Sequence, residues 1–181
     1  MKRRLAVFGV TLALALMAFA PGAQATSSRD WSGLTSQGYP VQFTVVKFNG
    51  QSVVTRWHIG FLELCLKSGT VMHWDITYGV GMKVVKGKFH YADDMREFPG
   101  FLYLGVNGRI DHGKATGTAK LLVANITPKL KAEICTSGSS AWTATPGGSM
   151  AGAHATGAEI RISVVRHPDG TITRSMRGLS G

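Results

Sequence analysis

The chain has 181 residues, of which 44% are apolar and only 17% are charged, and it contains two cysteines. This composition excludes an intrinsically disordered chain, which has fewer apolar residues and more charge, and it excludes a cysteine-rich miniprotein. There are 20 Lys and Arg residues against 10 Asp and Glu residues, so the formal charge is +10.

The first 25 residues have the pattern of a secretory signal peptide. Lys2-Arg3-Arg4 precedes an apolar run over 5–20, and Ala23-Gln24-Ala25 has the small-x-small form that signal peptidase accepts. The run is short for a bilayer span and ends at Pro21-Gly22, so we expect cleavage after Ala25 and no transmembrane segment afterwards. Cleavage removes three cations and leaves +7. We expect a secreted protein, extracellular or held in the periplasm or cell envelope.

The segment after the signal peptide leads into a domain of short strands. Residues 26–38 are rich in Ser, Thr and Gly and predict a loose N-terminal arm, followed by a single domain over 39–145. Apolar and polar residues alternate over 41–45, and Asn49-Gly50 predicts a hairpin turn into the next strand. Residues 53–66 have apolar side chains at odd positions before Gly60 and at even positions after it. A bulge at Gly60 would bring both sets to the same face of one strand.

Further strands are predicted along the rest of the domain. The alternating runs are 71–77, 84–91, 102–110 and 115–124, with a turn at 111–114. In the last run Ala115, Gly117 and Ala119 form a face of small residues, which leaves room for aromatic side chains opposite. Residues 146–157 predict a flexible linker, and 158–181 predict either a basic C-terminal hairpin or a basic tail.

The fold class follows from this pattern. No window of 11 or more residues combines a 3.6-residue apolar period with helix caps, so little helix is expected. Short strands separated by turn residues predict an all-β fold, with an antiparallel β-sandwich or jelly roll ahead of an open barrel.

Several segments, in this order, resemble a family of small secreted bacterial proteins common in actinobacteria, to which no established activity is attached. The resemblance covers residues 33–145 and implies a β-sandwich with one disulfide, and it implies no catalytic residue. It rests on Gly-Leu-Thr-Ser-Gln-Gly-Tyr-Pro-Val at 33–41, Cys65 followed by Gly69, Val85-x-Gly87-Lys88-Phe89, Ala-Thr-Gly-Thr at 115–118, Cys-Thr-Ser-Gly at 135–138 and Trp-Thr-Ala at 142–144.

The two cysteines are expected to form a disulfide. In an oxidising compartment, a pair in a small secreted domain is usually bridged. A bridge between Cys65 and Cys135 would close about 70 residues and stabilise the fold by roughly 4 kcal/mol on the chain-entropy model. A reactive thiol would need an adjacent base or a helix N-terminus, which the sequence does not show.

A row of basic and aromatic residues is the candidate binding site. Lys86, Lys88 and His90 are alternate residues of one expected strand, so they share one of its faces. In the next expected strand Phe101 and Tyr103 alternate with the core residues Leu102 and Leu104, so they point away from the core. Such a face would attract an anionic polymer and stack on sugar rings. The competing interpretation is that the lysines guard an edge strand against aggregation and that other elements cover the aromatic residues.

Glu63 is the candidate catalytic residue of a different function. It lies among apolar residues, where burial would raise its pKa and make it a general acid of a glycan hydrolase. A glycosidase needs a second carboxylate, and nothing in the sequence selects one among Asp75, Asp93, Asp94 and Glu97. We therefore expect Glu63 to face outward on a half-exposed strand, and we name no catalytic residue.

Other ligands have weaker support. His73 and Asp75 share a strand face, but a third metal ligand is not identifiable, so neither a metal nor another cofactor is expected. Nucleic acid is not expected as a partner, because the cations are spread through the chain without a recognition motif. The sequence favours a non-catalytic protein that binds an extracellular or envelope polymer or a surface protein. A glycan hydrolase is the second hypothesis, and a structural or host-directed protein that acts through its basic tail is the third.

Overall fold

The computed structural model describes residues 25–79, 81–94, 100–124, 133–148, 159–166 and 171–179. Over these residues the secondary structure consists of strands and turns without helix, so no helix there is long and apolar enough to cross a membrane. The strands are β1 (Ala25–Thr35), β2 (Pro40–Phe48), β3 (Gln51–Cys65), β4 (Val71–Tyr78), β5 (Met82–Val84), β6 (Lys88–Asp94), β7 (Phe101–Asp111), β8 (Lys114–Ala124), β9 (Ile134–Thr136), β10 (Ser140–Pro146), β11 (Glu159–Arg166) and β12 (Ile172–Leu179).

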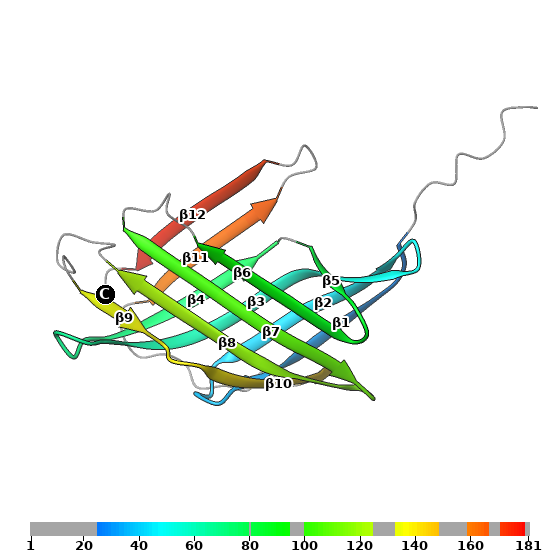
Figure 1. The fold of residues 1–181 in the computed structure, drawn as a ribbon, viewed down its shortest axis with the longest axis horizontal. Helices are drawn as coiled ribbons and strands as arrows, with labels where there is room; N and C mark the ends of the chain where they lie inside the picture. The colour runs from blue at the N-terminus through cyan, green and yellow to red at the C-terminus, as the bar shows by residue number, and fades with distance from the viewer. Residues whose placement is uncertain are drawn as a thin grey trace, which may run out of the picture.

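The strands form one strongly curved sheet (Figure 1). Its order is β12-β11-β4-β3-β2-β1-β10-β8-β7-β6, and β5 pairs with β3. The short strand β9 pairs with both β3 and β8, so that the sheet closes into a barrel-like arrangement. Every pairing is antiparallel except that of β11 with β4, which is parallel. The prediction of an all-β fold with little helix is therefore confirmed.

Tight turns set two of the hairpins. Asn49 and Gly50 have φ angles of 48° and 76°, and His112 and Gly113 have 44° and 79°. Two consecutive residues at positive φ match the right-handed twist of paired strands, and Gly and Asn adopt this conformation at little cost. The predicted turn at Asn49-Gly50 thus joins β2 to β3, and the predicted turn over 111–114 joins β7 to β8.

Aromatic side chains fill the centre of the barrel. The Phe43 ring lies 5.0 Å from the Trp57 ring, and the Trp57 ring lies 5.1 Å from the Trp142 ring. Gly117 leaves the space that Trp142 occupies, since a Cβ atom there would lie 2.4 Å from Cζ2 of the indole. Gly117 of β8 therefore lies against an aromatic side chain, as the sequence predicts for this face of small residues. All four tryptophans are buried, Trp31 and Trp74 being the other two.

The loose arm predicted over 26–38 is wrong. Most of this segment belongs to β1, which pairs with β2 on one side and with β10 on the other. Trp31 is 4% exposed and stacks on Phe43 with 5.7 Å between the rings. One large buried aromatic residue and two rows of backbone hydrogen bonds thus order a segment rich in Ser and Thr.

The bulge predicted at Gly60 lies elsewhere. Thr44 pairs with Arg56 whereas Val45 pairs with Val54, so the register between β2 and β3 shifts there and Thr55 is the extra residue. Gly60 serves a different purpose, because a Cβ atom on it would lie 3.0 Å from Cβ of Tyr39. The inward residues of β3 after the bulge all have odd numbers, and Leu64 and Leu66 remain exposed.

The single strand predicted over 84–91 is two strands. β5 ends at Val84, and β6 begins at Lys88 after a turn in which Lys86 and Gly87 have φ angles of 50° and 74°. Val85 pairs with Lys88 across this turn. The alternation of apolar residues continues through the turn in the sequence, which explains why it reads as one strand.

The C-terminal residues form the hairpin β11–β12, one of the two structures predicted for 158–181, and β11 extends the sheet beside β4. Cys65 and Cys135 are bridged, as predicted, and the bridge joins β3 to β9. The predicted signal peptide, apart from Ala25, lies outside the described residues, as does most of the predicted linker over 146–157.

Candidate functional site

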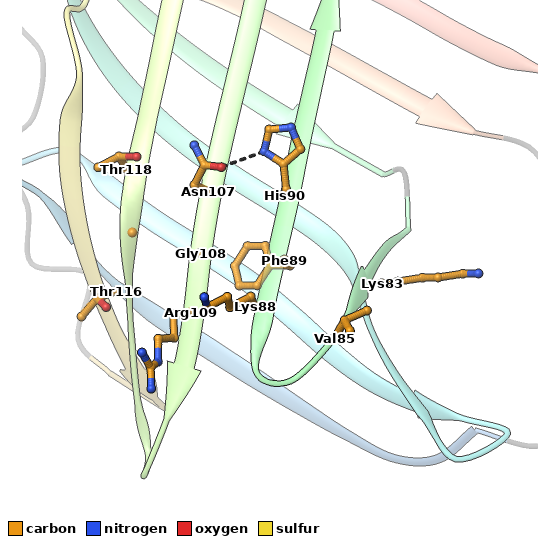
Figure 2. A pocket seen from close by; sticks show the side chains of 11 residues that line it. Lys83, Val85, Lys88, Phe89, His90, Asn107, Gly108, Arg109, Thr116 and Thr118 are labelled. Atoms are coloured by element: carbon orange, nitrogen blue, oxygen red, sulfur yellow. Dashed lines mark hydrogen bonds between the residues drawn. The ribbon is translucent and has the colours of Figure 1, made fainter.

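A hollow of about 660 Å³ lies on the outer face of β6, β7 and β8, next to β5 (Figure 2). Side chains alternate between the two faces of each strand, so the residues next to the buried Phe89 and Gly108 point outward into this hollow. Among the described residues that line it, three side chains are cations and none is a carboxylate. The hollow is lined by Lys83, Val85, Lys88, Phe89, His90, Asn107, Gly108, Arg109, Thr116, Gly117 and Thr118.

We call this hollow the cationic groove. Lys88 and Arg109 form its most strongly charged part. They are directly opposite each other on β6 and β7, and both are exposed. Figure 2 shows the Lys88 side chain extending from β6 towards β7. Arg109 also makes a long contact with Asp111, with 3.4 Å between Nη2 and Oδ2. Like charges opposite each other destabilise a sheet, so the pair is a cost that a bound anion would offset.

Neutral hydrogen-bonding groups continue the groove along the strands. His90 lies opposite Asn107, and its Nδ1 atom is 2.7 Å from the Asn107 Oδ1 atom. Thr116 and Thr118 on β8 lie beside Arg109 and Asn107, respectively. Imidazole, amide and hydroxyl groups all donate hydrogen bonds to anionic oxygen atoms. The cations therefore stand in a surface that also offers neutral donors.

The predicted binding residues fall into three groups. Lys88 and His90 line the cationic groove. Phe101 and Tyr103 lie on the same outer face of β7, farther along the strand and partly buried. Lys86 is in the turn between β5 and β6, so it does not share a strand face with Lys88.

Sequence reasoning missed Lys83, Asn107 and Arg109. Asn107 and Arg109 have the same parity as Phe101 and Tyr103, which would have placed them on the outer face. The pairing that puts Arg109 opposite Lys88 depends on the register of β6 against β7, and the alternation within each strand does not fix that register.

Glu63 does not face outward as predicted. Its side chain is fully buried opposite Met72, and neither carboxyl oxygen has a hydrogen-bond partner among the described residues. Burial raises the pKa of Glu63 to about 8, and the nearby Trp74 indole offsets part of the shift, although its N–H group is not in good hydrogen-bond geometry with the carboxyl group. A general acid must reach its substrate within hydrogen-bond distance. Glu63 lines neither the cationic groove nor a second hollow on the outer face of β3 and β4.

Polar residues also gather on the outer face of β3 and β4. His58 Nε2 bonds to Asp75 Oδ1, and the Tyr39 hydroxyl group lies 2.9 Å from Nδ1 of His73. His73 and Asp75 thus have different partners, and the described residues contain no group of three side chains that could hold a metal ion. A second hollow, of about 460 Å³, is lined here by His58, Asp75, Thr77, Ile162, Ser163, Ser175 and Arg177.

The chain was compared with protein-family models, curated proteins and solved structures, and no match was found. The resemblance of residues 33–145 to small secreted bacterial proteins therefore stays a prediction.

Proposed function

We propose that this is an exported, non-catalytic binding protein that holds an anionic polymer in the cationic groove. The observation that carries the proposal is the groove's charge: the described residues that line it include Lys83, Lys88 and Arg109 but no carboxylate, and two of these cations are cross-strand neighbours. Neither Lys83 nor Lys88 forms an ion pair among the described residues. Such a surface raises the local concentration of anions.

An extended ligand suits this groove better than a small anion. Its cations are exposed, and an exposed ion pair contributes only about 0–1 kcal/mol. A polymer adds several such contacts within one molecule, so that each further contact forms at a high effective concentration.

Export is part of the proposal and rests on the N-terminal sequence. The signal-peptide pattern ends at Ala25, and the Cys65–Cys135 bridge fits an oxidising compartment. Sequencing of the exported protein is expected to show Thr26 as its first residue. A mature protein that retained Met1 or Lys2 would contradict this part.

The binding experiment measures the affinity of the purified protein for labelled poly-L-glutamate at several NaCl concentrations. We expect the affinity to fall steeply as salt rises, because exposed charges are screened within about 8 Å at physiological ionic strength. The test variant is Lys88→Gln/Arg109→Gln. Its matched control is Arg56→Gln/Lys67→Gln, which removes one Arg and one Lys at exposed positions outside the groove.

The groove proposal requires the two double variants to differ. We expect the Lys88→Gln/Arg109→Gln variant to bind at least about tenfold more weakly than the wild type, as two lost contacts near 0.7 kcal/mol each would give. The control variant is expected to stay within about threefold of the wild type. Equal losses in both variants would show that net charge, and not the groove, governs binding.

A further inference from the structure

The Tyr103 ring lies flat along β7 and points towards the cationic groove. A Cβ atom on Gly105 would lie 2.8 Å from the Tyr103 hydroxyl oxygen and 3.1 Å from Cε1. The ring therefore extends from position 103 over position 105, which is the direction of Asn107 and Arg109 along the same face. Gly105 makes this arrangement possible because it has no side chain.

The ring and the groove belong to one continuous surface. Gly105, Asn107 and Arg109 are alternate residues of β7, so Gly105 and Arg109 are about 14 Å apart at about 3.4 Å per residue. Lys120 on β8 lies opposite Gly105, and Leu122 lies opposite Tyr103. Tyr103 and Leu122 thus form an aromatic and apolar patch, which we call the platform. Lys120 lies between this platform and the cationic groove.

The platform favours different chemistry from the groove. Tyr103 and Leu122 are uncharged neighbours on β7 and β8, so they favour contact with a neutral, apolar part of a ligand. A ligand that spans both ends needs a neutral face against Tyr103 and negative groups near Lys88, Arg109 and Lys120. A sugar ring has an apolar face that stacks on aromatic side chains, and acidic sugars also carry carboxylates.

We infer that the polymer held by this protein is an anionic glycan, one of whose sugar rings stacks on Tyr103 while its acidic groups contact the cationic groove. This inference rests on the proposed function, since it assigns a chemical class to the polymer bound there. In this inference Gly105 is a positioning residue, because its missing side chain leaves room for the Tyr103 ring to lie along the strand.

Three probes separate the two halves of the inference. Polygalacturonate carries both carboxylates and sugar rings, poly-L-glutamate carries carboxylates without sugar rings, and dextran carries sugar rings without charge. We expect the wild type to bind polygalacturonate more tightly than poly-L-glutamate of the same charge number, and to bind dextran weakest.

Four variants test the role of the ring. Tyr103→Ala removes the ring, and Gly105→Ala keeps it but displaces its hydroxyl end, which can move because it is the tip of a flexible side chain. We expect each to lower the affinity for polygalacturonate by about three- to tenfold, as loss of one aromatic stacking contact would, and to leave that for poly-L-glutamate unchanged. Tyr103→Phe retains the stacking ring and is expected to bind normally. Phe48→Ala, which removes an exposed aromatic ring on β2, is the control and is expected to bind both polymers normally.

The outcomes distinguish this inference from the proposed function. If the Tyr103→Ala and Gly105→Ala variants bind polygalacturonate as tightly as the wild type, while Lys88→Gln/Arg109→Gln binds it weakly, the glycan inference is wrong and the groove proposal stands. If the lysine and arginine variant binds every probe normally, the proposed function is wrong.

Discussion

Glu63 lies directly opposite Met72 on the inner face of the β3–β4 pair, where its carboxyl group is buried and has no hydrogen-bond partner in the described part of the chain. Met72 in turn contacts the disulfide, with its Sδ atom 3.6 Å from Sγ of Cys65 and 3.9 Å from Sγ of Cys135. An acid therefore occupies an apolar region of the core, next to the covalent bridge. A charged carboxylate in such a place is costly, so the group remains protonated at neutral pH.

The buried acid is expected to make the protein less stable as pH rises. The pKa of Glu63 is about 8 in the folded protein against 4.5 for the ordinary group. Between these values the unfolded chain has released this proton and the folded chain retains it, so the free energy of unfolding falls by up to roughly 1.4 kcal/mol per pH unit. The loss starts near pH 4.5 and is complete near pH 8. Urea unfolding from pH 5 to 9 measures it, and Glu63→Gln should flatten that part of the profile. Identical slopes in the two proteins would contradict this account.

Reduction of the Cys65–Cys135 bridge is expected to lower the melting temperature. The bridge joins β3 to β9 across 70 residues of sequence, so it restricts the unfolded chain by an amount that the chain-entropy model puts at roughly 4 kcal/mol. Melting curves with and without reductant measure the change. The control is Cys65→Ala/Cys135→Ala, which should melt at one temperature in both conditions. Detection of two titratable thiols in the native, air-oxidised protein would refute the bridge.

The sequence predicts those parts of the fold that depend on residues close together in the chain. Alternation and turn residues such as Asn49-Gly50 locate hairpins, because both the face of a side chain and the turn are local properties. β1 was missed because its order comes from Trp31 packing on Phe43 and from pairing with β10, more than 100 residues away. The parallel pairing of β11 with β4 is likewise long-range and has no local signal.

The candidate site is only half predictable for the same reason. Lys88 and His90 have the parity of outward residues within one strand, and the sequence assigns them to a surface. The opposition of Lys88 and Arg109 needs the register between two strands, and the flat position of Tyr103 needs knowledge that Gly105 lies beneath its ring. The sequence does not predict burial of Glu63, because the bulge at Thr55 decides which residues of β3 point inward after it. Thr55 is not a residue type that marks a bulge.

Substitution of Gly108 by Ala is expected to destabilise the core. Gly108 lies opposite Phe89, and a Cβ atom there would be 2.1 Å from Cζ of the ring, which itself packs against Phe43 and Trp57. The Phe89 ring must shift from its contacts with these two aromatic rings to admit the methyl group, so we expect a loss of about 1–3 kcal/mol, as overpacked cores show. Urea unfolding measures it. In the Phe89→Leu background the same substitution should cost less, and equal costs in both backgrounds would show that the clash with Phe89 is not the cause.

Removal of the Lys88 charge is expected to stabilise the protein at low salt. Lys88 and Arg109 repel each other across β6 and β7, and a cross-strand pair contributes roughly 0.2–1 kcal/mol. The Lys88→Gln variant should therefore unfold at a slightly higher urea concentration than the wild type in 20 mM NaCl, and the difference should vanish in 500 mM NaCl because salt screens exposed charges. Arg56→Gln is the matched control, since Arg56 is exposed and lies opposite the uncharged Thr44. A Lys88→Gln variant that is no more stable than the wild type at low salt, or one whose gain survives at high salt, would mean that the two cations are not in electrostatic conflict and would remove the main physical reason for placing an anion between them.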